Sequence, residues 1–217
     1  MTMLLLALLA LVSVAAGATP CSQQFTKAKA TFNDKLGIPA NLDWNNVDQL
    51  RSAVEAKFSD NGAFGLRDVC VAFRFYRTSF DDFDKCVRVV ELVSDPTGHA
   101  TGVTRQQAYD YLSLMAQLDY TCGGGYEIFT NQDNCVSYQF TNQTGTLKAA
   151  RDTFFSQVFR DSRDVCGYAF DLMQSYQNVF GPCGDSAGFF GCEYARVGVH
   201  FHYPQCTDNF CIANHKF

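Results

Sequence analysis

Residues 104–135 read TRQQAYDYLSLMAQLDYTCGGGYEIFTNQDNC, and this stretch decides the class of fold. Thr104 and Gln107 have the spacing of a capping box, in which two side chains pair with backbone N–H groups at the start of a helix. Apolar residues then recur every three or four positions, which predicts one helical stripe: Ala108, Leu112, Met115 and Leu118. We expect the glycines at 123–125 to end this helix, because glycine adopts the left-handed conformation that other residues resist.

The same helical periodicity recurs along most of the chain. It predicts helices over residues 21–36, 45–58, 147–158 and 164–178, and a last short helix through residues 189–195. The polar stretch 136–145 is expected to be a loop. No stretch before residue 200 alternates in the manner of a strand. We therefore expect an all-α, disulfide-stapled helical bundle of about six to eight helices, with an irregular cysteine-pinned C-terminal tail from His200 onward.

The most regular apolar pattern covers residues 66–90, where the gaps alternate between three and four residues. On one continuous helix Cys70 and Cys86 would lie about 24 Å apart, which is too far for a disulfide between them. Ser79 and Asp82 could instead restart the helix midway. The segment is either one long helix whose cysteines pair elsewhere or two helices that meet at a bend.

The amino terminus indicates the compartment. Residues 3–18 form an apolar run that ends in small residues, as in a secretory signal peptide. This run is shorter than the ~20 apolar residues that span a bilayer, so we expect no membrane span. We expect a signal peptide over residues 1–18 and a secreted, extracellular helical domain over residues 19–217, which is either one unit or two related helical units.

The cysteines point to the same compartment. An even number of cysteines beyond a signal peptide is typical of a disulfide framework. We expect all ten to form five intramolecular disulfides: Cys21, Cys70, Cys86, Cys122, Cys135, Cys166, Cys183, Cys192, Cys206 and Cys211. Ten cysteines allow roughly 945 pairings, so the connectivity does not follow from the sequence. No CxxC pair is present, which argues against a zinc site.

One internal repeat reduces the number of disulfide pairings that we expect. The residues RDVC occur at 67–70 and again at 163–166, and each copy is followed by a further cysteine, Cys86 and Cys183. This repeat predicts a duplicated helical unit, in which the cysteines of the two copies occupy equivalent places and join corresponding partners.

Composition and one short motif bear on partners. The net charge of −5 has no basic cluster set against it, which argues against nucleic acid. The 20 Phe and 10 Tyr are expected to build the core. Asn142 opens the sequon Asn-Gln-Thr, and in a secreted chain we expect it to carry a glycan in an exposed loop.

Residues 184–188 fit the pattern G-x-S-x-G, which surrounds the nucleophile of many serine hydrolases. That pattern requires a buried strand before the serine, whereas Ser186 follows the dipeptide 181–182, Gly-Pro. Asp208 and His215 would complete a triad in order of sequence only. We therefore expect Ser186 to lie at a helix start, and a serine hydrolase is the least favoured function.

Other polar pairs have simple structural explanations. His200 and His202 would share a face of an extended segment, but no third metal ligand is evident. Asp81, Asp82 and Asp84 are expected in a first helical turn, where negative charge suits the helix dipole. The sequence therefore predicts no catalytic, cofactor-binding or metal-binding residue, and we do not expect an enzyme.

A family resemblance adds to this. Residues 118–127, LDYTCGGGYE, together with Cys135 resemble a segment of secreted nematode proteins. Those proteins belong to a helical, cysteine-rich domain family of unknown function and to the related chondroitin-proteoglycan-type domain. The run from Cys183 to Cys211, with CEYAR at 192–196, is also similar to the first group. The resemblance implies a secreted helical fold and no activity. Chondroitin proteoglycans carry their chains on Ser-Gly, a dipeptide that this sequence lacks.

Two main functions follow from these expectations. The first is a secreted non-enzymatic helical module that binds an extracellular protein or a matrix component. The alternative is an extracellular carrier of an apolar small molecule or lipid. An enclosed apolar cavity of a few hundred Å³ would favour the carrier. A filled core with an exposed apolar patch would favour the binding module.

Overall fold

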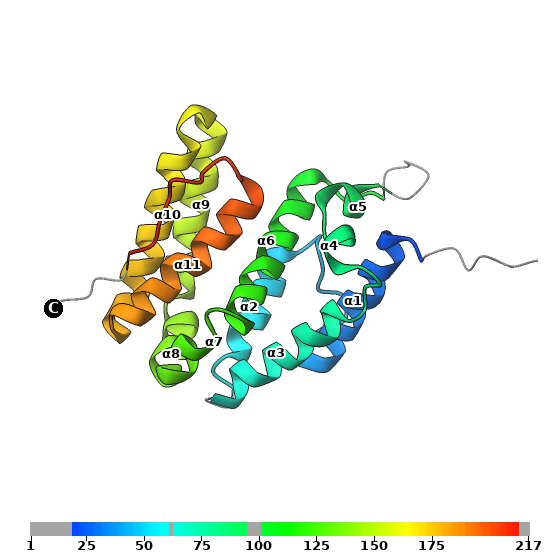
Figure 1. Cartoon of the computed structure of the whole chain (residues 1–217), viewed down its shortest axis with the longest axis horizontal. Helices are drawn as coiled ribbons and strands as arrows, with labels where there is room; N and C mark the ends of the chain where they lie inside the picture. The colour runs from blue at the N-terminus through cyan, green and yellow to red at the C-terminus, as the bar shows by residue number, and fades with distance from the viewer. Residues whose placement is uncertain (1–18, 61–62, 95–100, 213–217) are drawn as a thin grey trace, which may run out of the picture.

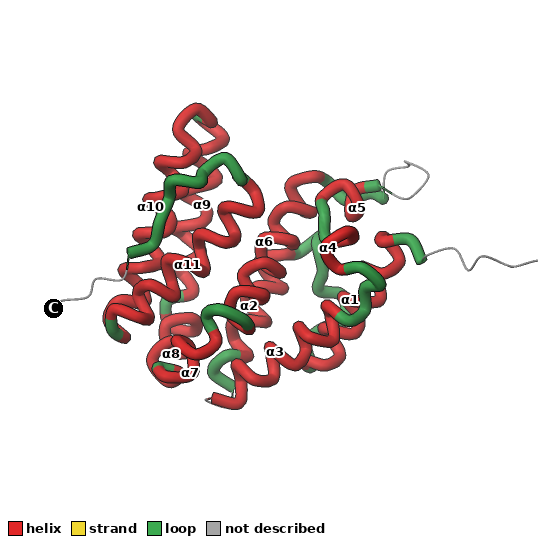
Figure 2. Tube along the Cα trace, in the orientation of Figure 1, coloured by secondary structure: helices red, strands yellow, loops and turns green. Residues whose placement is uncertain are grey.

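The computed structural model describes residues 19–60, 63–94 and 101–212, and within them the chain forms eleven α-helices and no β-strand (Figure 1, Figure 2). The helices are α1 (Cys21–Leu36), α2 (Val47–Lys57), α3 (Ala63–Arg77), α4 (Phe83–Cys86), α5 (Val89–Val93), α6 (Arg105–Cys122), α7 (Tyr126–Asn131), α8 (Asp133–Asn142), α9 (Thr144–Arg160), α10 (Val165–Phe180) and α11 (Asp185–His202). This confirms the all-α prediction, and eight of these helices have ten or more residues. The predicted signal peptide lies outside the described residues.

Helices α1 to α6 make an N-terminal group in which α1 and α6 both pack against α3 (Figure 1). The apolar stripes of α1 and α3 meet there. Phe25 and Phe80 are an edge-to-face pair with ring centroids 5.1 Å apart, and Tyr76 packs against Phe32 at 6.2 Å. Such aromatic pairs add stability beyond the apolar area that they bury.

Helices α7 to α11 make a C-terminal group built on α10, which packs against both α9 and α11. Helix α11 also packs along α6 and so joins the two groups. Beneath this junction lies a cluster of buried aromatic rings: Phe58, Phe129, Phe140, Phe180, Phe190 and Tyr194. The groups therefore share one hydrophobic core.

All ten cysteines are paired, as the sequence predicted. The disulfides are Cys21–Cys86, Cys70–Cys122, Cys135–Cys183, Cys166–Cys206 and Cys192–Cys211. Among the first four cysteines of the chain, the first joins the third and the second joins the fourth. Cys135, Cys166, Cys183 and Cys206 follow the same order, while Cys192, which lies between the last two, belongs to a separate disulfide. A duplicated unit predicts this order for Cys70 and Cys166, and the duplication itself stays a prediction.

The regular pattern over residues 66–90 is broken near Ser79, which agrees with the second of the two alternatives. Three helices occupy it, because α4 and α5 both follow the break. Asp82 begins α4 by accepting a hydrogen bond from the backbone N–H of Lys85 at 3.1 Å. Each of the two cysteines in this segment pairs with another element.

The prediction of a loop over residues 136–145 was wrong, because α8 and the start of α9 cover it. Val136 and Phe140 lie four positions apart on α8, and both are fully buried in the aromatic cluster. Two apolar residues at helical spacing outweigh the polar residues around them, since tertiary burial decides the state of a short polar helix.

The predicted start of the tail was also wrong. Helix α11 continues through His202 because Ala195, Gly198 and Val199 on one face pack against the rest of the core. The irregular tail begins at Tyr203 and runs along α10 (Figure 1). The disulfides of Cys206 and Cys211 hold it there, and the Gln177 side chain donates a hydrogen bond to the Ile212 carbonyl at 3.2 Å.

Helix α6 confirms the predicted capping box and ends at Cys122, immediately before the three glycines, as predicted, but the predicted left-handed conformation is wrong. Thr104 and Gln107 each bond the backbone N–H of the other, at 2.9 and 3.2 Å. None of the glycines 123–125 has a positive φ. Gly125 is required for packing instead, since a Cβ atom there would lie 2.9 Å from the rings of Tyr120 and Phe190.

Candidate functional site

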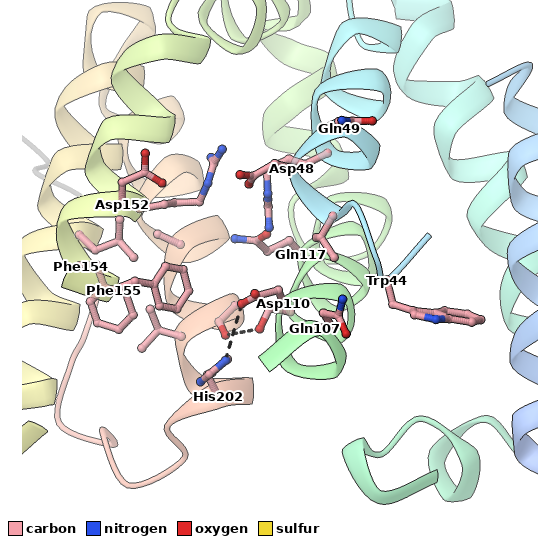
Figure 3. Close-up of a pocket in the computed structure, with 18 of the residues that line it drawn as sticks. Trp44, Asp48, Gln49, Gln107, Asp110, Gln117, Asp152, Phe154, Phe155 and His202 are labelled. Carbon is pink, nitrogen blue, oxygen red and sulfur yellow. Dashed lines mark hydrogen bonds and ion pairs between the residues drawn. The ribbon is translucent and has the colours of Figure 1, made fainter. Parts of the chain in front are cut away.

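A pocket of about 410 Å³ lies where α2 and α6 face α9, α10 and α11 (Figure 3). Five helices from both groups line it, and they bring together residues that are distant in the sequence. Its lining mixes charged, amide and apolar side chains. The volume falls within the range of about 300–1,000 Å³ that is typical of small-molecule sites.

The polar side of the pocket comes from a stripe on α6. Asp110, Ser113 and Gln117 are spaced by three and four residues, so they share a face that differs from the predicted apolar stripe. This polar stripe was not predicted from the sequence. The sequence does contain a pattern that indicates it: three polar side chains recur at helical spacing within a helix whose other faces carry apolar residues.

The floor of the pocket is a largely buried polar cluster, which we call the floor cluster. Its members are Arg51, Gln117, Arg151 and Tyr176, which line the pocket, and Glu55 and Tyr194, which contact Arg51. Arg51 Nη1 donates to Gln117 Oε1 at 2.6 Å and to the Tyr194 hydroxyl at 3.3 Å. Gln117 Nε2 in turn donates to the Tyr194 carbonyl at 3.0 Å, so the arginine is held between α6 and α11.

Glu55 is the one carboxyl group of this cluster, and its side chain is only 2 % exposed. Its Oε1 lies 3.8 Å from Arg51 Nη1. Within the described part of the chain, neither carboxyl oxygen accepts a hydrogen bond. Burial raises the pKa of Glu55, and the positive charges of Arg51 and then Arg151 oppose that rise.

Arg151 reaches the floor from α9. Its Nη1 donates to the hydroxyl of buried Tyr176 at 2.7 Å. This bond connects α9 to α10 directly beneath the pocket. Two guanidinium groups therefore line one site, that of buried Arg51 and that of half-buried Arg151, and the buried charge carries the larger desolvation cost.

Close contact between α6 and α11 depends on Gly198. A Cβ atom there would lie 2.8 Å from Gln117 Nε2. The Ser113 hydroxyl donates to the Gly198 carbonyl at 3.1 Å. The absence of a side chain at Gly198 thus lets Gln117 reach the backbone of α11 and hold Arg51.

The opposite wall of the pocket is apolar. Phe154 and Phe155 project from α9, Leu172 from α10 and Val199 from α11. All four also pack against the hydrophobic core. A ligand that entered this pocket would therefore meet cationic and amide groups on one side and hydrocarbon on the other.

His202 closes one end of the pocket, where its Nε2 lies 3.8 Å from Asp110 Oδ1 (Figure 3). Its ring packs against Tyr109 with centroids 4.2 Å apart, and its side chain is 8 % exposed. Burial lowers the pKa of His202 to about 4, so the imidazole is neutral at pH 7. Burial also raises the pKa of Asp110.

The mouth of the pocket carries a second set of charges, which we call the rim cluster: Asp48, Lys148 and Asp152. Lys148 Nζ lies 3.5 Å from a carboxyl oxygen of Asp48 and 2.8 Å from one of Asp152. All three side chains are about half exposed or more. Water therefore solvates the rim cluster, in contrast to the floor.

Ser186 and Asp208, the two residues of the possible serine-hydrolase triad that the structure describes, are both exposed. Ser186 is exposed in the first turn of α11, and no strand precedes it in the described residues. Asp208 is exposed in the tail, and His215 lies outside the described residues.

The possible metal ligands are also separate. His200 is exposed while His202 is buried, because they lie two positions apart on a helix. Among residues 19–60, 63–94 and 101–212, no group of three or more potential metal ligands occurs. Of the three aspartates at 81–84, Asp82 caps α4, and Asp81 bonds the Gln24 side chain.

Asn142 is exposed, but it ends α8 and does not lie in a loop. Its side-chain amide donates to the Tyr138 carbonyl at 3.1 Å. Glycosylation of Asn142 stays a prediction.

Comparison of this chain with protein-family models, curated proteins and solved structures gives no match. The resemblance to secreted nematode proteins therefore stays a prediction. Five disulfides are typical of an extracellular protein. In the part of the chain that the structure describes, no helix combines the length and the hydrophobicity needed to cross a bilayer.

Proposed function

We propose that this protein is a secreted, non-enzymatic binding protein that carries a small molecule in the pocket between its two helical groups. The observation behind this proposal is the pocket of about 410 Å³, in which two arginines face an apolar wall. The five disulfides and the apolar run at residues 3–18 support secretion.

The lining of the pocket also changes the kind of ligand that we expect. A carrier of a purely apolar molecule would have an enclosed apolar cavity, whereas this pocket opens between exposed charges and has a polar floor. The ligand should therefore carry both a polar group and an apolar part.

Native mass spectrometry of the protein purified from a eukaryotic secretory host tests this proposal. We expect a bound small molecule, about one per chain, that is released on denaturation. Asp152→Trp, which places an indole at the pocket mouth, should abolish it. Ser156→Trp is the matched control, because Ser156 is exposed on the same helix and does not line the pocket. Equal occupancy in both variants, or no ligand even after incubation with a lipid extract, would contradict the proposal.

A second candidate function is binding of an extracellular protein or matrix component. It is favoured by an apolar surface around the tail, where Phe170, Phe210 and Ile212 are 44, 66 and 69 % exposed. These side chains border a groove of about 440 Å³ beside α10. If this function holds, the double variant Phe210→Ser and Ile212→Ser should lose binding to purified matrix while its disulfides stay intact; unchanged binding would exclude this surface.

A further inference from the structure

The proposed carrier function leaves the chemical class of the ligand open. Resting on that function, we infer that the ligand is an amphipathic anion, whose carboxylate is bound by Arg51 and Arg151 and whose hydrocarbon part lies along Phe154, Phe155, Leu172 and Val199. A fatty acid of medium chain length is the simplest member of this class.

The first argument is charge. Arg51 and Arg151 bring two positive charges to the floor, while Glu55 brings at most one negative charge. A buried net charge is costly unless a counter-charge accompanies it. A ligand carboxylate supplies that counter-charge beside Arg51, whose side chain is only 6 % exposed.

The second argument is the supply of hydrogen-bond donors. A guanidinium has five N–H donors in a planar fork that matches a carboxylate. Among the described residues, Arg51 and Arg151 each donate only through Nη1. The Nε and Nη2 donors of both groups remain for a ligand, and the bonds to Gln117, Tyr194 and Tyr176 hold the two forks in place.

The negative charges around the pocket do not reverse this conclusion. Asp48 and Asp152 share Lys148 at the exposed rim, where salt and water screen them. Asp110 lies seven residues before Gln117 on α6, about 10 Å along the helix from the amide that holds Arg51. A cationic ligand would have to bind at the rim or beside His202, and it would leave the floor uncompensated.

The third argument is the apolar wall, which fits an anion with a hydrocarbon chain better than a small anion such as phosphate or acetate. Two phenylalanines, a leucine and a valine face the same space as the arginines. Each CH₂ group of a ligand buried against them contributes roughly 0.8 kcal/mol of transfer free energy, so a chain of several carbons binds more tightly than phosphate or acetate.

The chain contains one tryptophan, Trp44, and it lines this pocket. Its indole, however, packs edge-to-face against Tyr111 with ring centroids 5.7 Å apart and points away from the apolar wall (Figure 3), so its emission is not used as the readout. Isothermal titration calorimetry at pH 7 and constant ionic strength with decanoate, decanol and decylamine, each below its micellar concentration, compares an anion, a neutral molecule and a cation on one hydrocarbon chain.

We expect decanoate to bind about 10- to 100-fold more tightly than decanol, the range for hydrogen bonds to charged groups, and decylamine to bind most weakly. Arg151→Gln should remove this preference for decanoate. Arg160→Gln is the matched control, since Arg160 is exposed on the same helix and outside the pocket. The comparison of the three ligands with wild-type protein does not depend on how well any variant folds.

Each other outcome has a definite meaning. Equal affinity for decanoate and decanol would overturn the inference and leave the carrier function standing. Tightest binding of decylamine would also overturn the inference, in favour of the carboxylates of the rim cluster. If none of the three ligands binds, the inference fails, and the native mass spectrum decides separately whether any small molecule is carried. Retention of the decanoate preference by a folded Arg151→Gln variant would remove Arg151 from the site.

Discussion

The floor cluster and the rim cluster are built from similar ionic groups, but solvent treats them differently. On the floor, Arg51 and Glu55 have side chains that are 6 and 2 % exposed. On the rim, Asp48 and Lys148 are 66 and 47 % exposed. The rim ions keep most of their hydration, so their pairing contributes little to the free energy of unfolding. Arg51 and Glu55 have lost most of their hydration, so the stability of each charge depends on its contacts within the protein.

In the proposed carrier function, this difference assigns ligand specificity to the floor cluster. Exposed ions at the mouth can change partners at little cost, whereas Arg51 is fixed by bonds to Gln117 and Tyr194. A fixed, desolvated charge discriminates between ligands, because a wrong ligand leaves it unpaired. The four predictions below test this comparison, from the largest expected effect to the smallest.

Arg51→Met should destabilise the fold by about 3–5 kcal/mol, the range for breaking a buried ion pair. The change removes the nearest positive charge from Glu55 and leaves two oxygens of Gln117 and Tyr194 without their donor. Urea unfolding with intact disulfides measures it.

Arg163→Met is the control, because Arg163 pairs with Asp161 on the surface and its loss should have little effect on the free energy of unfolding. The double variant Arg51→Met and Glu55→Met should regain much of the loss, since no buried charge remains. If the single variant Arg51→Met unfolds like wild type, the floor is not a tightly coupled cluster.

Protonation of His202 should lower the free energy of unfolding in acid. Its pKa is about 4 in the folded protein against the ordinary 6.5, so the unfolded chain binds the proton first. This stability is complete above pH 6.5 and is lost as the pH falls through 4. At about 1.4 kcal/mol per pKa unit the loss is roughly 3 kcal/mol, and residual contact with water reduces it to about 2 kcal/mol.

The measurement is the free energy of unfolding at several pH values for wild type and His202→Gln. The difference between the two proteins should change across pH 6.5 to 4 and be flat above pH 7. A constant difference over the whole range would show that His202 is not buried as described.

Gly198→Ala should cost about 1–3 kcal/mol, because the new methyl group would displace the Gln117 side chain that holds Arg51. Gly145→Ala on α9 is the matched helical control. A Cβ atom at Gly145 meets nothing within 4 Å, so this change should be neutral or stabilise by up to about 1 kcal/mol. Thermal unfolding of both variants suffices, and equal shifts would contradict the close α6–α11 contact.

Lys148→Met should change stability by less than about 1 kcal/mol, although Lys148 contacts two carboxylates. The effect should shrink further as NaCl is added, because exposed pairs are screened. Urea unfolding at low and high salt measures both. A loss as large as that of Arg51→Met would mean that rim and floor do not differ.

Much of the fold was predictable from local patterns. The capping box at Thr104 and the apolar stripes of α1, α2 and α10 are signals within one helix, and the structure has helices at these places. The errors arose where contacts with distant residues decide the state. Helix α8 exists because Phe140 fits the aromatic cluster, and α11 extends to His202 because it packs along α6.

The sequence by itself determined the class of this protein: helical periodicity, ten cysteines and an apolar amino terminus predict a disulfide-stapled all-α domain. Only the tertiary structure decided which of the roughly 945 pairings occurs and which polar residues meet at the pocket. Arg51 and Tyr194 are 143 positions apart, and Arg51 and Gln117 are 66 apart. No local pattern links such residues, because their neighbourhood comes from the packing of α6 against α11, which depends on shape and burial across the whole chain.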